Sequence, residues 1–261
     1  MALIGELIVG RPLSELPGVL AQAAREGSKV MIIADSSVAQ KHGQALKNGL
    51  SRAGFEASLT SVPSGERSKS FAQAQKLYRE LARKKFERKS WLVALGGGVV
   101  GDLTGFVAAT YLRGVRYVQV PTTLLAQVDA SIGGKTGVDI PEGKNLVGSF
   151  YHPKLIWILP SLLKTLPARH LRNGLAEVIK YGAIADGKLF ELLESKIDVL
   201  LKGYSVEWDA IIARCAAIKA DVVKRDPTEQ TGLRAILNFG HTVGHAIEGA
   251  LGYRHVLHGE A

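Results

Sequence analysis

The chain has 261 residues, of which 46% are hydrophobic and 22% are charged, a composition typical of a soluble globular protein. Its formal net charge of +9 attracts anions, but only 7% of its residues are aromatic and no nucleic-acid-binding module is recognisable. We therefore favour a small phosphorylated or carboxylated ligand over nucleic acid. No apolar run approaches the roughly 20 residues of a membrane-spanning helix, and no secretory signal is evident at the N-terminus. The single cysteine cannot form an internal disulfide, which fits a cytoplasmic protein.

The first part of the chain alternates apolar strand-like runs with helical stretches. The pattern predicts strands at Val30–Ala34, Ala57–Val62, Trp91–Leu95 and Tyr117–Val120, and helices at Ser37–Ala53, Ser70–Lys85 and Val99–Tyr111. Ser70 is the expected cap of the second helix, and Gly54 the expected stop of the first. Such alternation predicts a parallel, doubly wound sheet with helices on both faces.

The second part of the chain is predicted to be helical. Residues 126–150 are rich in glycine and read as loops with a hairpin, after which Leu155–Leu159 is a further strand. Helices are predicted at Ala168–Tyr181, Lys188–Leu201, Glu207–Lys224 and Gly240–Leu251. We therefore predict an α/β fold with two domains, a Rossmann-like domain over residues 1–163 and an all-helical domain over residues 164–261. Cys215 lies in an apolar helical pattern, which favours a buried core residue over a nucleophile.

Three histidines near the end of the chain are the strongest functional signal. His241 and His245 are four residues apart, so a helix places them on one face, and His258 follows after a short loop. Clustered imidazoles indicate a divalent metal site or a proton-transfer site. Glu177 lies among apolar neighbours on a predicted helix, where a carboxylate needs a partner. That partner is either Lys180, in a surface ion pair, or a metal ion shared with the histidines.

Two glycine-rich segments could hold an anion. Gly96–Asp102 joins a strand to a helix, where the backbone can approach a pyrophosphate closely, although its spacing differs from the usual dinucleotide fingerprint. Asp129–Thr136 lacks the spacing of a P-loop, but Lys135 and the later pair Lys144-Asn145 can still meet an anion. The alternatives are a tight turn without a ligand at the first segment, and solvated hairpin turns with surface lysines at the second.

In their order along the chain, these motifs resemble the 3-dehydroquinate synthase family of sugar-phosphate cyclases. The resemblance rests on Gly96–Asp102, Pro121–Thr123, Asp129–Gly137, Gly143–Asn145, Leu163–Pro167, Gly174–Tyr181 and Leu237–Glu260. It implies NAD and a divalent metal, zinc or cobalt, and a homodimer. The implied reaction is a phosphate-eliminating lyase step of the shikimate pathway to chorismate and the aromatic amino acids. It would convert 3-deoxy-D-arabino-heptulosonate 7-phosphate to 3-dehydroquinate and phosphate.

The resemblance also implies roles for individual residues. The metal ligands would be Glu177, His241 and His258. The catalytic residues would be His245, Lys135, Lys180, Arg234 and Asn238. The substrate contacts would be Arg113, Asp129, Lys135, Asn145, Lys180, Lys219, Arg234, Asn238 and His245. The cofactor contacts would be Asp35, Ser64, Gly65, Glu66, Arg67, Ser68, Lys69, Gly98, Val99, Val100, Gly101, Asp102, Thr122, Thr123, Lys135, Lys144, Leu162, Leu163, Lys164 and Thr165.

Three other functions compete with this interpretation. One is another NAD- and metal-dependent cyclase, such as a 2-deoxy-scyllo-inosose or valiolone synthase. The second is a metal-dependent polyol dehydrogenase on a related fold, and the third is an inactive NAD-binding fragment. The last of these is considered because members of the family usually continue for several tens of residues beyond the motif His258-Gly-Glu260, so we expect a shortened helical domain.

Overall fold

The computed structural model describes residues 5–24, 28–252 and 256–261, and they form two compact units. The first unit comprises residues 1–122 and 134–159, and the second comprises residues 123–133 and 160–261. Residues 123–133 thus belong to the helical unit, although they lie inside the span 1–163 that the sequence assigns to the first domain. The domain limits themselves stay a prediction.

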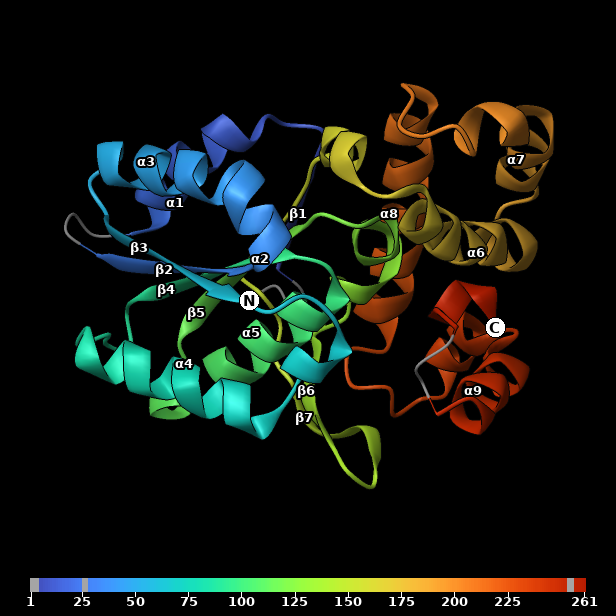
Figure 1. Cartoon of the computed structure of the whole chain (residues 1–261). Coiled ribbons are helices and arrows are strands. Elements are labelled where there is room, and N and C mark those ends of the chain that lie inside the picture. The colour runs from blue at the N-terminus through green and yellow to red at the C-terminus, as the bar shows by residue number, and fades with distance from the viewer. Residues whose placement is uncertain (1–4, 25–27, 253–255) are drawn as a thin grey trace. The chain divides into compact units, whose positions relative to one another are not determined.

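The first unit is built on a parallel six-stranded sheet with the order β1-β8-β5-β4-β2-β3 (Figure 1). Its strands are β1 (Glu6–Val9), β2 (Lys29–Asp35), β3 (Glu56–Val62), β4 (Trp91–Gly96), β5 (Arg116–Pro121) and β8 (Leu155–Ile158). The five strands predicted from the sequence are confirmed. Strand β1 was not predicted, because it has only four residues and its pairing partner, β8, is about 150 residues away in the chain.

Helices cover both faces of this sheet, as the alternating pattern predicts (Figure 1). Helices α1 (Leu16–Ala23) and α3 (Gln44–Arg52) lie on one face, and α4 (Phe71–Arg83) and α5 (Gly98–Thr110) lie on the other. The predicted cap of α4 is confirmed, because the Ser70 side chain accepts a hydrogen bond from the Gln73 N–H. The predicted helix 37–53 is divided into α2 (Ser36–Val38), a π-helix, η2 (Ala39–Gly43), and α3.

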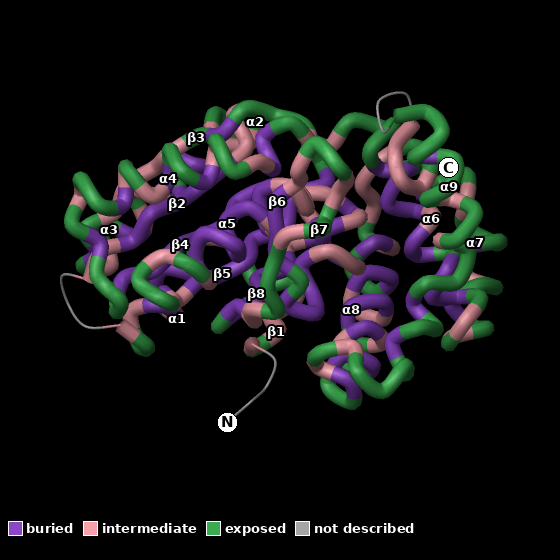
Figure 2. The backbone as a smooth tube through the Cα atoms, turned by 90° about the horizontal axis from the view of Figure 1, so that it is seen from below, coloured by how far each residue is buried: buried purple, intermediate pink, exposed green. Residues whose placement is uncertain are grey.

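One hydrophobic core cluster of the first unit lies between the sheet and helices α4 and α5. Every residue of β4 is buried, as are five of the seven residues of β2, and Figure 2 shows this buried layer. Leu77 and Leu81 of α4 pack in one cluster with Leu103 and Val107 of α5. Strands that are apolar on both sides are what a parallel sheet covered on two faces requires.

Two glycines of α5 set how closely this helix packs against its neighbours. A Cβ on Gly101 would lie 2.5 Å from the Gln119 side chain of β5, and a Cβ on Gly105 would lie 2.4 Å from the Thr136 methyl group. Thr136 belongs to the predicted hairpin, which is confirmed as β6 (Lys135–Ile140) and β7 (Gly143–Phe150). Gly101, the last glycine of the motif Gly96–Asp102, therefore has a packing role that does not depend on a ligand in the loop.

The second unit consists mainly of helices. They are α6 (Ala168–Ala185), α7 (Gly187–Leu200), α8 (Glu207–Arg225) and α9 (His241–Ala250), with shorter helical segments η5 (Ala126–Ala130), η6 (Pro160–Thr165), η7 (Leu233–Asn238) and η8 (His258–Glu260). The four predicted helices are confirmed, but η5 is a π-helix where the sequence suggests a loop. Cys215 is fully buried in α8, and burial raises the pKa of its thiol to about 12, which agrees with a core residue. Among the described residues, no helix has the length and apolar character needed to cross a membrane.

We predict that Gly105→Ala destabilises the first unit by about 1–3 kcal/mol, because the new methyl group must displace buried Thr136. The midpoint of thermal unfolding measures this loss.

Gly18→Ala is the matched control, since Gly18 is also a helical glycine but nothing lies within 4 Å of its Cβ position. We expect that control to be neutral or slightly stabilising. Equal midpoints for the two variants would contradict the packing role of Gly105.

Candidate active site and metal centre

Two histidines and one carboxylate of the second unit converge, although they come from three separate elements. The His258 Nε2 atom of η8 lies 3.2 Å from Glu177 Oε1 of α6, and the His241 Nε2 atom of α9 lies 3.6 Å from the same oxygen. The ring centroids of His241 and His258 are 4.9 Å apart. One carboxylate oxygen and two imidazole nitrogens thus face a common point, the donor set of many catalytic zinc sites.

The second nitrogen of each imidazole faces an oxygen atom. The His241 Nδ1 atom is 3.2 Å from the Phe239 carbonyl oxygen, and the His258 Nδ1 atom is 3.5 Å from Glu248 Oε2. A proton on each Nδ1 atom satisfies these contacts, and once Nε2 has lost its own proton its lone pair is free to bind an ion that Glu177 also contacts. Ligand histidines of metalloproteins have this arrangement, so the residues present fit a divalent ion.

His245 lies close enough to compete with Glu177 as a ligand. Among the described residues, His241, His245 and His258 form a group whose potential ligand atoms lie within 4.8 Å of one another. His245 is exposed on α9, whereas Glu177 is buried. The geometry therefore allows a Glu/His/His set or a three-histidine set, and the assignment of Glu177 stays a prediction.

Glu177 is held ionised by its neighbours. Burial opposes the ionised form, but the hydrogen bond with His258 and the ammonium of Lys180 outweigh it and hold the pKa of Glu177 below its usual value. The same hydrogen bond raises the pKa of His258, whereas burial lowers the pKa of His241. A surface ion pair with Lys180 was one of the two alternatives for Glu177; the pair is present, but both side chains are buried.

Asp129 of η5 connects this cluster to α8. Its Oδ1 atom lies 2.7 Å from Lys219 Nζ and 3.6 Å from Lys180 Nζ, and it accepts a hydrogen bond of 2.7 Å from the Tyr181 hydroxyl. Burial opposes ionisation of Asp129, yet the two ammonium groups hold its pKa well below the usual range. Burial lowers the pKa of Lys219, because the cost of removing its ammonium from water outweighs the attraction of Asp129. Three predicted substrate contacts are therefore brought together.

Most of the predicted cofactor residues of the first unit follow the carboxyl ends of β2, β3 and β4. Asp35 accepts hydrogen bonds from the Ser37 N–H and from the Ser64 hydroxyl, which lies 2.9 Å away. The Lys144 Nζ atom of the hairpin lies 3.5 Å from Glu66 Oε1. Side chains from the end of β2, the loop after β3 and the hairpin thus contact one another in pairs at the edge where nucleotides bind in open α/β sheets.

Lys69 joins three segments of this group. Its buried Nζ atom lies 2.6 Å from Asp102 Oδ2 near the start of α5 and also donates to the Asn145 side chain of the hairpin. The Asn145 N–H donates in turn to Asp139 Oδ1, and this contact holds Asn145 in a left-handed conformation with φ of 58°. Asn145 and Asp102 are therefore fixed in space through one ammonium group.

Other predicted residues lie apart from these groups or are buried. Arg113 follows α5 in η4, before the amino end of β5, at the opposite edge of the sheet from Asp35. Arg234 is buried, and its guanidinium donates to the Pro227 carbonyl oxygen. The side chains of Leu162 and Leu163 are also buried, whereas Asn238 is exposed at the end of η7.

The remaining predicted residues sit as follows. Thr122 is buried and its N–H donates to the Gly96 carbonyl oxygen, Thr123 Oγ1 accepts from the Ala126 N–H, and Lys135 is exposed at the start of β6. Lys164 lies over the Tyr204 ring. No comparison tests these individual roles, so they stay predictions.

Sequence reasoning missed several residues of the metal centre. Tyr181, Glu248, Asn173 and Glu260 all contact predicted site residues or their neighbours in the chain. Asn173 precedes Glu177 by four residues, so the helical repeat alone could have placed it on the same face.

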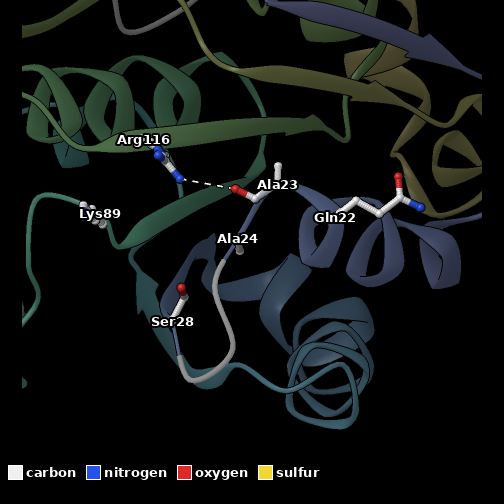
Figure 3. A pocket seen from close by; sticks show the side chains of 6 residues that line it. All are labelled: Gln22, Ala23, Ala24, Ser28, Lys89 and Arg116. Atoms are coloured by element: carbon white, nitrogen blue, oxygen red, sulfur yellow. Dashed lines mark hydrogen bonds between the residues drawn. The ribbon is translucent and has the colours of Figure 1, made fainter.

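A cavity of about 230 Å³ lies at the amino edge of the sheet (Figure 3). Arg116 lines it and donates to the Ala23 carbonyl oxygen at 3.4 Å, and Ser28 and Lys89 also line it. None of the predicted site residues lines this cavity. The predicted cofactor-binding residues of the first unit lie instead at the carboxyl ends of the strands.

Comparisons with known proteins agree with the motifs. Residues 59–173 match the 3-dehydroquinate synthase N-terminal family, and residues 174–261 match the 3-dehydroquinate synthase C-terminal family. The chain is 50% identical over 248 residues to 3-dehydroquinate synthase of Symbiobacterium thermophilum, covering 95% of this chain and 69% of that protein. It is 52% identical over 237 residues to the Nostoc punctiforme 3-dehydroquinate synthase, covering 90% of this chain and 65% of that protein.

A solved structure shares the fold. It is 2-epi-5-epi-valiolone synthase from Streptomyces hygroscopicus, with NAD+ and Zn2+ bound. It is 31% identical to this chain with a TM-score of 0.88, and the match covers 98% of this chain and 70% of that one. The chain thus spans about two thirds of the length of the proteins that it matches.

We predict that Glu177→Gln weakens Zn2+ binding far more than His245→Gln does, because the amide removes the anionic donor that both Nε2 atoms face. Competition with a chelating dye measures the two affinities. Glu194→Gln, on the exposed surface of α7, is the control and should bind as the wild type does. The opposite order, with His245→Gln the weaker binder, would indicate the three-histidine set.

We further predict that Asp129→Asn destabilises the protein by up to about 3 kcal/mol at neutral pH, since two buried ammonium groups lose their shared counter-charge while the partly exposed site lets water reduce the loss. Urea unfolding measures the difference. Because the folded pKa of Asp129 is lowered, its contribution is present above the ordinary carboxyl pKa of about 4 and is lost as the pH falls further.

Asp221→Asn is the matched control, because it breaks an exposed pair with Arg225 and should cost less than about 1 kcal/mol. Similar losses in the two variants would contradict the special position of Asp129.

Proposed function

The chain belongs to the 3-dehydroquinate synthase family, and we propose that it converts 3-deoxy-D-arabino-heptulosonate 7-phosphate into 3-dehydroquinate and phosphate. The observation that carries the proposal is the convergence of Glu177, His241 and His258 beside the buried cations Lys180 and Lys219. When bound, NAD would supply a hydride acceptor that returns the hydride within one turnover, and zinc or cobalt would supply a Lewis acid. On this proposal the protein is a phosphate-eliminating lyase.

In the proposed site, Glu177, His241 and His258 hold the metal ion. The Phe239 carbonyl oxygen and Glu248 orient the two imidazoles, so that each Nε2 lone pair stays directed inward. Lys180 keeps the second oxygen of Glu177 occupied. The carboxylate therefore presents one oxygen to the ion, with its orientation fixed from the other side.

Lys180 and Lys219 supply the positive charge that a substrate with a carboxylate and a phosphate needs. Both ammonium groups are anchored on Asp129, which limits their motion and keeps them side by side. Asn145 and Lys135 of the first unit and Arg234 and Asn238 of the second are the further proposed contacts. His245 is exposed on the same helix as His241, so it can accept or donate a proton at its imidazole ring without serving as a ligand.

The proposed NAD site lies at the carboxyl edge of the sheet in the first unit. Helix α5 begins there directly after β4, and no side chain caps its N-terminus. The free N–H groups and the positive end of the helix dipole suit a pyrophosphate at Gly98–Asp102. Asp35 and Ser64, which already contact each other, would hold the adenosine half.

A cytoplasmic location and a homodimer remain parts of the proposal, and both rest on the family resemblance.

We predict that the protein releases phosphate from the heptulosonate phosphate only when NAD and a divalent metal are both present, and that a chelator stops the release. Phosphate and NADH are measured in the same reaction. A synthase returns its hydride, so phosphate should accumulate without net NADH. The full-length Symbiobacterium thermophilum protein provides the positive control.

Each rival function gives a different result in this assay. A polyol dehydrogenase would accumulate NADH, and an inactive fragment would bind NAD without releasing phosphate. Another cyclase would prefer a sugar phosphate that lacks the carboxylate, because such an enzyme does not need the full cationic set. Any of these three results would contradict the proposed activity.

A further inference from the structure

Three residues of α6 form a row that receives the short helix η8. Arg169, Asn173 and Glu177 are spaced by four residues, so they lie along one face of the helix. The segment His258-Gly-Glu260 meets this row in reverse order. Glu260 contacts Arg169, the Gly259 N–H contacts Asn173, and His258 contacts Glu177.

The outer contact is a two-point ion pair. The Arg169 Nε and Nη2 atoms donate to the two Glu260 oxygens, each at 2.7 Å. The Oε2 atom of Glu260 also accepts from the Leu257 N–H at 2.8 Å, which closes the turn on itself. A bidentate pair of this kind fixes both the distance and the angle between its partners. The ion pair at Glu260 therefore fixes the C-terminal end of the turn that carries His258.

The middle contact requires glycine. The Gly259 N–H donates to Asn173 Oδ1 at 2.6 Å, and Asn173 is buried. A Cβ at position 259 would lie 2.1 Å from the Asn173 carbonyl oxygen and 2.9 Å from the Ala176 side chain. Glycine thus allows the backbone of η8 to lie directly on α6, one residue away from the imidazole.

We propose that Arg169 and Asn173 are positioning residues for the metal ligand His258. An ion pair as exposed as that of Arg169 and Glu260 adds little to global stability. Its effect on geometry is larger, because it restricts the positions that the turn, and with it the imidazole of His258, can adopt. The inference rests on the metal site of the proposed function, and it extends that site to residues that touch neither metal nor substrate.

The test measures Zn2+ affinity by competition with a chelating dye in the wild type and in Arg169→Gln. We expect at least a ~10-fold weaker affinity in the variant, the loss typical of residues that orient metal ligands. Arg225→Gln is the matched control, since Arg225 is also an exposed, ion-paired arginine of the second unit, and its affinity should be unchanged. Thermal unfolding of both variants shows that the fold is retained.

A double-mutant cycle with Glu260→Gln separates positioning from a general effect. If the pair acts as a clamp, the double variant should bind Zn2+ no more weakly than either single variant. Asn173→Ala should weaken binding as well, and the visible absorption of the Co2+-loaded protein should change in both Arg169→Gln and Asn173→Ala. A merely structural role would leave that spectrum unchanged.

The outcomes distinguish the two proposals. A wild-type protein that binds no Zn2+ contradicts the metal site, and with it this inference. Wild-type affinity and an unchanged Co2+ spectrum in Arg169→Gln contradict the positioning role alone. Additive losses in the cycle also overturn it.

Discussion

The second unit depends on one carboxylate that is shared by two buried lysines. Asp129 comes from a single turn of π-helix, Lys180 from α6 and Lys219 from α8, so one charge cluster joins segments up to 90 residues apart. Buried ammonium groups are costly without a counter-charge, and Asp129 supplies it for both. Lys180 then reaches Glu177, so the orientation of that carboxylate depends on the same cluster. The charge balance that allows these residues to be buried also places the central oxygen of the metal centre.

Helix α6 meets several structural and chemical demands along one broad face. Gly174 lies so close to Leu124 and Leu125 that a Cβ would meet the Leu125 nitrogen at 2.5 Å, which brings the segment leading into η5 onto the helix. Lys180 and Tyr181 face Asp129. The row of Arg169, Asn173 and Glu177 receives η8. A helix that only buried an apolar stripe would not need polar side chains such as Asn173, Glu177 and Lys180 on its buried side. The position of Glu177 among apolar neighbours therefore indicates a functional site.

The sequence predicts the fold well where local periodicity decides it. Strands β2 and β4 read as continuous apolar runs, and the long helices show a clear repeat. Strand β1 and the π-helix η5 depend on distant partners, so local patterns cannot reveal them. In the site, the spacing of His241 and His245 and the isolation of Glu177 were visible. The helical repeat places Asn173 on the face of Glu177, but its contact with Gly259, 86 residues away, is set by the folded chain.

The metal centre also bears on local stability. Its three proposed ligands come from α6, α9 and η8, and these elements differ greatly in how they are packed. Half of the residues of α6 are buried, whereas α9 exposes Val243 and Ile247 and buries only Glu248. A helix with few buried apolar contacts opens at low cost. An ion bound by Glu177, His241 and His258 would link α9 and η8 to α6. Metal binding would therefore stabilise α9 and η8 against local unfolding. The three proposed metal ligands would therefore also hold together the elements that form the site.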